Sequence, residues 1–229
     1  MEHIIKEIKN NPLFDNMSED EIKKVLNCGD ATVESFTDNQ ILIEKNNRVK
    51  KLGIVIEGVL NLVSQKYNGT RVIVTTLEKS DLFGEALIYA SASYSPYDLI
   101  SSCKSKVLLI PNRVFSNMCS RGCSCHNQLI INMLTILSDK IVMLNNKMSI
   151  FNAETLKGRI AVYLLSLQKK ANTMTFDMPM NRQELAEFLN VKRPSLSREF
   201  SNMQKDNIIE VYRSSVKILD MAALLELAD

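Results

Sequence analysis

Residues 181–198 read NRQELAEFLNVKRPSLSR, and this stretch decides the fold of the C-terminal part of the chain. Its apolar side chains recur where two short helices, over 182–189 and 193–206, would pack across a tight turn. These side chains are Leu185, Leu189, Val191 and Leu196. Asn190 stands at the turn, where a positive φ is needed and asparagine accepts it more readily than most residues. The stretch therefore predicts a helix-turn-helix.

The residues around this helix pair extend the prediction. Asn181 is a suitable N-cap for the first helix, and Pro194 fits the first turn of the second helix, where its missing N–H has no cost. Two short β-rich runs follow, over 208–211 and 216–219, with a turn between them. A β-hairpin after the second helix makes the unit a winged helix-turn-helix. Proteins of this kind insert the second helix into the major groove of DNA.

The predicted DNA contacts cluster around the start of the second helix. Arg198 is expected to read a base, because a guanidinium can donate two hydrogen bonds to the acceptors of guanine. Lys192, Ser195 and the N-terminus of the helix are expected to hold phosphates. The full predicted set is Arg182, Gln183, Lys192, Arg193, Ser195, Ser197 and Arg198. The alternative is a helix-turn-helix that serves only as scaffold, with a solvated cluster of basic side chains.

A heptad pattern precedes this unit along the chain. Apolar residues recur at alternating spacings of 4 and 3, as in the seam of a coiled coil. The seam consists of Ile130, Leu134, Leu137, Ile141, Leu144, Met148 and Phe151. A helix with this stripe could instead lie on its own domain, but Met133 and Met143 supply a second apolar face for that contact. We therefore favour a parallel homodimer, whose two recognition helices would stand about 34 Å apart on a palindromic site in double-stranded DNA.

The region over residues 31–111 has a different pattern. Short runs rich in Val, Ile and Leu alternate with turn signals at intervals of roughly 8 to 12 residues, as in an antiparallel barrel or sandwich. Asn68-Gly69 predicts a type I′ hairpin turn, and Ser18 with Glu21 predicts a capping box at the start of an N-terminal helix. The predicted fold class is α+β, with an effector-sensing β-rich domain over 1–123, a dimerisation helix over 124–151 and a winged helix over 152–229.

Composition places the chain among ordinary globular proteins. Its 229 residues are 45% hydrophobic and 24% charged, with a formal net charge of +2, so disorder is excluded and bulk charge neither indicates nor excludes a polyanionic partner. The apolar runs are far shorter than the roughly 20 residues that span a bilayer. Residues 1–11 lack the features of a secretory signal. We therefore expect a cytoplasmic protein with no membrane partner and, from its odd number of cysteines, with reduced thiols.

Five short motifs occur in a characteristic order: Pro12–Phe14, Ile56–Leu60, Asp81–Glu85, Leu156–Ala161 and the stretch 181–198. With these motifs in this order, the chain resembles the Crp/Fnr superfamily of bacterial transcription regulators over nearly its whole length. The resemblance implies an N-terminal cyclic-nucleotide-binding-like β-roll, a long dimerisation helix and a C-terminal winged helix-turn-helix whose orientation responds to an effector. It also implies RNA polymerase as a partner.

The chain departs from the family at the cassette that binds the cyclic phosphate. In family members that bind cyclic nucleotides, the Gly-Glu of this cassette is followed by an Arg-Ser or Arg-Thr pair. Here Gly84 and Glu85 are present, but the corresponding pair is Ser95-Pro96, and the sequence has no arginine between positions 71 and 113. A buried phosphate would lose its main charge-assisted contact. Cyclic AMP is therefore not the expected effector.

The recognition helix departs from the family as well. Relatives that read TTGA-type half-sites place a glutamate three residues before a Ser-Arg pair. Ser197-Arg198 match that pair, whereas Pro194 replaces the glutamate. The resemblance therefore supports guanine reading by Arg198 and leaves the rest of the half-site open.

Four metal-ligating side chains lie close together before the seam: Cys119, Cys123, Cys125 and His126. They suggest a redox, nitric-oxide or metal-dependent effector, with haem or a bound metal as a cofactor, although their spacing matches no usual zinc site and the metal is left unassigned. The alternative is that the cysteines are small buried thiols. The iron–sulfur sensors of the family carry their cysteines near the N-terminus, where this chain has only Cys28, so that mechanism does not transfer.

The residue inventory argues against an enzyme. A cupin-like metalloenzyme needs two or three histidines inside its barrel, and residues 31–111 contain none. The sequence also lacks the GxGxxG and GxxxxGK spacings of phosphate-binding loops. We therefore predict a regulator. Two alternatives remain: a thiol- or metal-dependent redox sensor whose DNA binding is secondary, and a protein-interaction module with a degenerate nucleotide-binding domain.

Overall fold

The computed structural model describes residues 2–66, 69–91, 94–116 and 124–228. The chain forms two compact units, Met1–Asp139 and Lys140–Asp229. The boundary between them falls inside one long helix, α4 (Ser124–Asn152), so that each unit contains one part of this helix. This helix occupies the range expected for dimerisation, 124–151.

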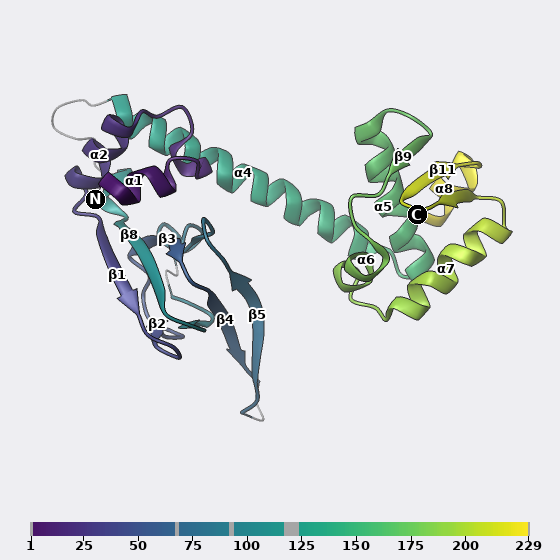
Figure 1. The fold of residues 1–229 in the computed structure, drawn as a ribbon. Coiled ribbons are helices and arrows are strands. Elements are labelled where there is room, and N and C mark those ends of the chain that lie inside the picture. The colour runs from purple at the N-terminus through teal and green to yellow at the C-terminus, as the bar shows by residue number, and fades with distance from the viewer. Residues whose placement is uncertain (1, 67–68, 92–93, 117–123, 229) are drawn as a thin grey trace. The chain divides into compact units, whose positions relative to one another are not determined.

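The N-terminal unit is built on two four-stranded antiparallel sheets, with strand orders β1-β8-β3-β6 and β2-β7-β4-β5 (Figure 1). The strands are β1 (Thr32–Phe36), β2 (Ile41–Ile43), β3 (Lys51–Glu57), β4 (Leu60–Gln65), β5 (Arg71–Leu77), β6 (Leu82–Phe83), β7 (Asp98–Ser101) and β8 (Ser105–Pro111). The predicted hairpin of β4 and β5 forms, but its turn differs from the predicted type I′ turn centred on Asn68-Gly69. The Gly69 N–H donates to the Lys66 carbonyl, so Gly69, with a φ of 81°, takes the fourth position of the turn, and Asn68 lies outside the described residues. The expected β-roll and α+β class are confirmed.

Helices cover one face of the first sheet. They are α1 (Glu2–Ile8), the short 3₁₀ helix η1 (Pro12–Phe14), α2 (Glu19–Cys28), α3 (Arg113–Ser116) and the first part of α4. The predicted capping box at α2 is present, because the Glu21 N–H donates to Ser18 Oγ and the Ser18 N–H donates to Glu21 Oε2.

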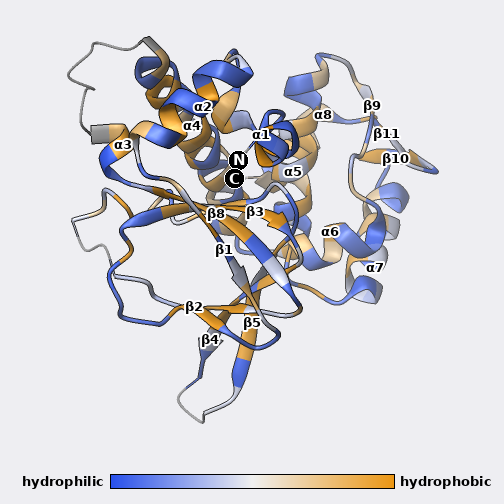
Figure 2. Ribbon diagram, turned by 60° about the vertical axis from the view of Figure 1, so that its left-hand side comes forward, coloured by the Kyte–Doolittle hydropathy of each residue, from blue (hydrophilic) through white to orange (hydrophobic). Residues whose placement is uncertain are grey.

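Side chains of the first sheet alternate between two cores, because successive residues of a strand point to opposite faces. In β3, Leu52 and Ile54 are buried in the core beneath the helices, whereas Val55 is buried in the core between the two sheets. In β8, Leu108 and Ile110 face the helices and Val107 faces the second sheet. This double burial explains the apolar character of the central strands (Figure 2).

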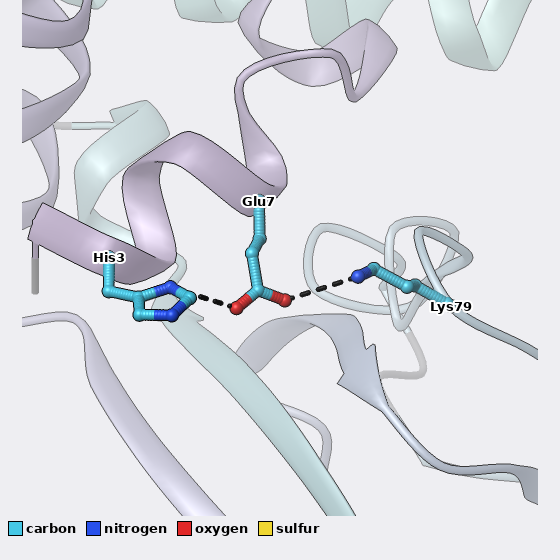
Figure 3. Close-up of polar contacts among 3 residues, drawn as sticks. All are labelled: His3, Glu7 and Lys79. Atoms are coloured by element: carbon cyan, nitrogen blue, oxygen red, sulfur yellow. Dashed lines mark hydrogen bonds and ion pairs between the residues drawn. The ribbon is translucent and has the colours of Figure 1, made fainter.

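The helix α1 is tied to the loop that precedes β6. Its Glu7 carboxylate lies 3.1 Å from His3 Nδ1 and 3.2 Å from Lys79 Nζ (Figure 3). Farther along, the buried side chain of Asn11 donates to the Ser80 carbonyl at 2.7 Å. These contacts hold the N-terminal segment against the loop that leads into the Asp81–Glu85 motif, although exposed ion pairs of this kind each contribute little to stability.

The first part of α4 is anchored by a buried polar side chain. Asn132 Nδ2 donates to the carbonyls of Leu13 and Asp15, at 2.9 and 2.8 Å. Leu129 and Met133 on the same part of the helix are buried in the core beneath the first sheet. Met133 therefore packs on its own unit as expected, whereas Met143 is 62% exposed and does not.

The C-terminal unit is a winged helix. Its elements after α4 are α5 (Leu156–Ala171), β9 (Thr175–Asp177), α6 (Arg182–Phe188), α7 (Arg193–Lys205), β10 (Ile209–Tyr212), β11 (Ser215–Ile218) and α8 (Met221–Ala228). The strands form an antiparallel sheet of order β10-β11-β9, so the predicted hairpin gains a third strand from upstream of the helix-turn-helix. The helix α8 packs on α5, with Leu224 fully buried.

By length and composition alone, residues Cys125–Asn152 of α4 could cross a membrane, which differs from the expectation drawn from short apolar runs. This criterion of length and mean hydropathy does not require an unbroken apolar run. Helices that pack on protein satisfy it equally well. The first part of α4 packs on protein in this way, through Leu129 and Met133.

We expect Asn132→Ala to lower the free energy of unfolding of the N-terminal unit by about 2 kcal/mol, because the carbonyls of buried Leu13 and of Asp15 would both lose their donor. Urea titration followed by circular dichroism would measure the change. The matched control is Asn127→Ala, since Asn127 is exposed on the same helix. Equal stability of the two variants would show that the Asn132 hydrogen bonds do not anchor α4.

Candidate nucleic-acid interface

The start of α6 is fixed by a capping box at Asn181. Its Oδ1 accepts hydrogen bonds from the N–H groups of Gln183 and Glu184, at 2.8 and 3.0 Å. Glu184 Oε2 in turn accepts from the Asn181 N–H at 2.8 Å. The predicted N-cap is therefore confirmed, and two otherwise unpaired N–H groups of the first turn gain partners.

The turn between α6 and α7 has the geometry that the sequence predicts. Asn190 has a φ of 54°, and its neighbours Leu185, Leu189 and Leu196 are completely buried. Val191 is half-buried against the same core. The small side chain of Ala186, 1% exposed, lies in this core as well. The helix-turn-helix is thus held by its own apolar residues.

The helix α7 separates a packing face from a solvent face. Its buried residues are Leu196, Phe200 and Met203. At about 100° per residue, Arg198 lies on the opposite side of the helix, and it is exposed. Lys192 at the N-cap position, with Arg193 and Ser195 in the first turn, is also exposed, and no acidic residue stands in that turn. This end of α7 therefore combines positive side chains with the positive end of the helix dipole.

The wing adds a cation that the sequence analysis did not assign. Arg213 occupies the tip of the β10–β11 hairpin with a φ of 54°, and its guanidinium lies 5.4 Å from the ring centroid of Tyr212. Both side chains are exposed. Together with Arg182 and Arg193, Arg213 lines a surface hollow of about 780 Å³. The sequence signal for Arg213 was its place in the turn over 212–215. Only the folded hairpin brings Arg213 to the hollow that Arg193 of α7 also lines.

Arg182 differs from the other predicted DNA contacts because it packs inside the unit. Its guanidinium carbon lies 3.4 Å from the ring centroid of Phe200, and its Nη1 donates to Met178 Sδ. Burial lowers the pKa of Arg182, and burial raises the pKa of the neighbouring Tyr163 hydroxyl to about 12. Contact of Arg182 with DNA stays a prediction. Gln183 is exposed, and its Nε2 donates to Glu187 at 2.6 Å.

Comparisons with known proteins agree with this geometry. Residues 158–227 match the Crp-like helix-turn-helix domain, and residues 33–121 match the cyclic nucleotide-binding domain. The transcriptional activator protein FnrL of Cereibacter sphaeroides is 24% identical over 84% of this chain and 78% of its own length. The chain belongs to the Crp/Fnr family. It is a transcription regulator with a DNA-binding helix-turn-helix, and its matched relatives are regulators as well.

Two further relatives show how widely the Crp/Fnr fold is shared. The cAMP-activated global transcriptional regulator CRP of Pasteurella multocida is 18% identical over 81% of this chain and 89% of its own length. The catabolite activator protein of Thermus thermophilus has the same fold, with 17% identity, a TM-score of 0.54 and coverage of 95% of this chain and 98% of that chain. Identities this low describe the fold and leave the effector open.

The phosphate cassette of this Crp/Fnr member has no arginine to bind an anion. Gly84 has a φ of 84° and approaches the backbone of Lys51 so closely that a Cβ would lie 2.9 Å from the Lys51 carbonyl oxygen. The Ser95 hydroxyl is buried and donates to the Tyr97 carbonyl at 2.6 Å. Ser95 is thus engaged by its own loop, and Pro96 beside it has no N–H to offer.

The structure describes part of the cysteine cluster. Cys125 and His126 are buried at the start of α4, whereas Cys119 and Cys123 lie outside the described residues. The Nδ1 atom of His126 has no hydrogen-bond partner within the described part of the chain. In that part, groups of three or more His, Cys, Asp or Glu side chains able to hold a metal do not occur. A metal, haem or redox role for this cluster stays a prediction.

We expect Arg198→Ala to weaken binding to a selected site by about tenfold or more while leaving binding to random DNA nearly unchanged, because the loss of a bidentate base contact removes roughly 1–3 kcal/mol of discrimination. Sites selected from a random library with the unaltered protein would supply the probe for fluorescence anisotropy. Equal weakening on both DNAs would show that Arg198 contacts only the backbone.

Arg213→Ala serves as the matched comparison on the wing. We expect it to weaken binding to selected and random DNA by the same factor and to reduce the salt slope by about 1, because a phosphate contact carries no sequence information. Anisotropy titrations at several salt concentrations measure the slope. A change in sequence preference would assign Arg213 to a base instead.

Proposed function

We propose that this regulator binds an inverted repeat in promoter DNA as a homodimer, under the control of an effector other than cyclic AMP. The observation that carries the proposal is the apolar surface of α4. Four residues of the predicted seam are more than half exposed: Leu134 at 58%, Ile141 at 57%, Leu144 at 54% and Met148 at 63%. Their a and d spacing is that of a helix that pairs with a copy of itself.

The other seam residues have contacts within the chain. Ile130 and Leu137 are partly buried against the core beneath the first sheet. The ring centroid of Phe151 lies 5.9 Å from Lys147 Nζ and 5.3 Å from the guanidinium carbon of Arg159. The exposed seam is flanked by Ile131, Val142 and Met143, each more than half exposed. An apolar surface of this extent marks a contact with another molecule, and a second α4 supplies the matching spacing.

Dimerisation would explain how the two recognition helices find their target. Two copies of α7 related by a two-fold axis would enter successive major grooves, about 34 Å apart. A single helix-turn-helix contacts few base pairs. A second copy bound to the same DNA therefore raises the affinity and lengthens the DNA sequence that is recognised. The expected setting is the cytoplasm, with RNA polymerase as the partner that transcribes the regulated promoter.

The cassette supports an effector other than cyclic AMP. Ser95 already donates its hydroxyl hydrogen to the Tyr97 carbonyl, and the sequence offers no arginine between positions 71 and 113. A cyclic phosphate bound there would lack the charge-assisted contact that an arginine of the cassette supplies. The domain therefore has the fold of a cyclic nucleotide-binding domain but lacks the arginine that binds the cyclic phosphate.

We expect Leu144→Glu to convert the dimer into a monomer and to weaken binding to the inverted repeat by at least tenfold, because two carboxylates would meet in an apolar seam. Sedimentation velocity and anisotropy would measure both effects. Asn146→Glu is the control, since Asn146 is exposed on the opposite side of the heptad. A Leu144→Glu protein that remained dimeric, or a monomeric unaltered protein, would refute the proposed interface.

Cyclic AMP at millimolar concentration should leave the midpoint of thermal unfolding of this protein and its affinity for the selected site unchanged, because the cassette itself has no arginine. Differential scanning fluorimetry and anisotropy measure these quantities. The CRP of Pasteurella multocida, which is cAMP-activated by name, is the positive control. A shift in this protein comparable to that of the control would overturn the assignment.

A further inference from the structure

The β-roll contains a cavity of about 320 Å³ that the phosphate cassette does not line. Its walls come from both sheets, because β1, β3, β6 and β8 contribute from the first sheet and β2 contributes from the second. We call this space the roll-mouth cavity. It is lined by Glu34, Phe36, Leu42, Ile43, Arg48, Val49, Lys50, Lys51, Phe83 and Leu109. Gly84, Glu85, Ser95 and Pro96 are not among these residues, although Gly84 lies against two residues that are, Val49 and Lys51.

The floor of the roll-mouth cavity is apolar. Phe36 and Phe83 belong to the core between the sheets, and Leu109 packs against that core. The position of the Phe83 ring depends on Gly53 in β3, because a Cβ at residue 53 would lie 2.0 Å from the ring. Leu42 on β2 is only half-buried, so part of its side chain is available to a ligand. An apolar group bound here would be removed from water on several sides.

The rim of the roll-mouth cavity is positive. Lys51 Nζ lies 3.2 Å from Glu34 Oε1, so these two charges compensate each other. Glu34 lies two residues before Phe36 in β1, and Lys51 lies four residues before Val55 in β3. Phe36 and Val55 face the second sheet. Since residues at even spacing along a strand point to the same face, Glu34 and Lys51 lie on the inner side of the roll as well. Arg48 and Lys50 line the same space, and they have no ion-pair partner among the described residues. The rim thus offers two uncompensated cations.

We propose that the roll-mouth cavity binds an aliphatic carboxylate of medium length, with its chain on the apolar floor and its carboxylate against Arg48 and Lys50. The volume limits the ligand to about ten non-hydrogen atoms, if each atom takes the roughly 30 Å³ that a water molecule occupies in the liquid. A free phosphate would leave the apolar floor empty, and a neutral hydrocarbon would leave both cations without a partner. A single anionic head on an apolar chain satisfies both surfaces.

This proposal goes beyond DNA recognition, because it names the chemical class of a ligand for the sensing domain, and its test does not involve DNA. Octanoate, with ten non-hydrogen atoms, is the probe for isothermal titration calorimetry on the full chain. 1-Octanol tests the chain without the charge, acetate tests the charge without the chain, and octylamine tests the opposite charge. We expect octanoate to bind at least tenfold more tightly than each of the three.

Two variants locate the site. Arg48→Met combined with Lys50→Met should weaken octanoate binding at least tenfold and bring its affinity close to that of 1-octanol. Lys24→Met combined with Lys104→Met is the matched control, since both lysines are exposed outside the roll-mouth cavity. Leu42→Trp fills the cavity and should abolish binding of octanoate and 1-octanol alike, with circular dichroism confirming the fold.

The outcomes are separable. Octanoate binding no tighter than that of 1-octanol, or unchanged affinity in the Arg48/Lys50 variant, would overturn the proposal. If Leu42→Trp does not fold, the charge variant and its control still decide the question. Selected-site binding by the unaltered protein is measured separately, so a failure of octanoate to bind would leave the proposed DNA recognition intact.

Discussion

A single helix, α4, carries more apolar surface than its own chain covers, and the rest of the molecule depends on how that surface is satisfied. Leu129 and Met133 pack beneath the first sheet, while the side chain of Asn132 pairs the carbonyls of Leu13 and Asp15. Beyond this anchor, Ile141, Leu144 and Met148 remain exposed. Burial of each such side chain is worth about 1.5–3 kcal/mol, so the exposed stripe favours a partner, and the heptad spacing makes another copy of α4 the best fit.

The winged helix contains one arginine that packs inside it and others that are exposed to solvent. Arg182 is half-buried and stacks on Phe200, so it helps to hold α6 against α7. Arg198 lies opposite the buried face of α7, and Arg213 stands at the wing tip, where neither is required by the core. Because the caps and apolar residues already define the fold, these exposed cations can be aimed at DNA without loss of packing.

The N-terminal β-roll has the fold of the cyclic nucleotide-binding domain that it matches. The first sheet is covered by helices on one face and by the second sheet on the other, which fixes the frame of the β-roll. Within that frame the cassette lacks an arginine, whereas Arg48, Lys50 and Lys51 line the roll-mouth cavity together with apolar side chains. One fold can bind different classes of ligand when different side chains line its cavities.

The sequence by itself determined the local features: the caps at Ser18 and Asn181, the positive φ at Asn190, the heptad period of α4 and the winged helix-turn-helix. The caps and the turn depend on residues within a few positions of one another, and the helices and the hairpin show repeating local patterns. Such features can be predicted from a single sequence. It could not show that Arg182 packs on Phe200 or that Arg213 shares a hollow with Arg193.

Nor could it show that the apolar residues of β5 are exposed and that β5 is an edge strand, or that Phe83, Leu109 and Arg48 line one cavity. Only the tertiary structure decided these points. Strand order and helix packing bring together residues that are far apart in the sequence, and no local pattern records which of them will meet.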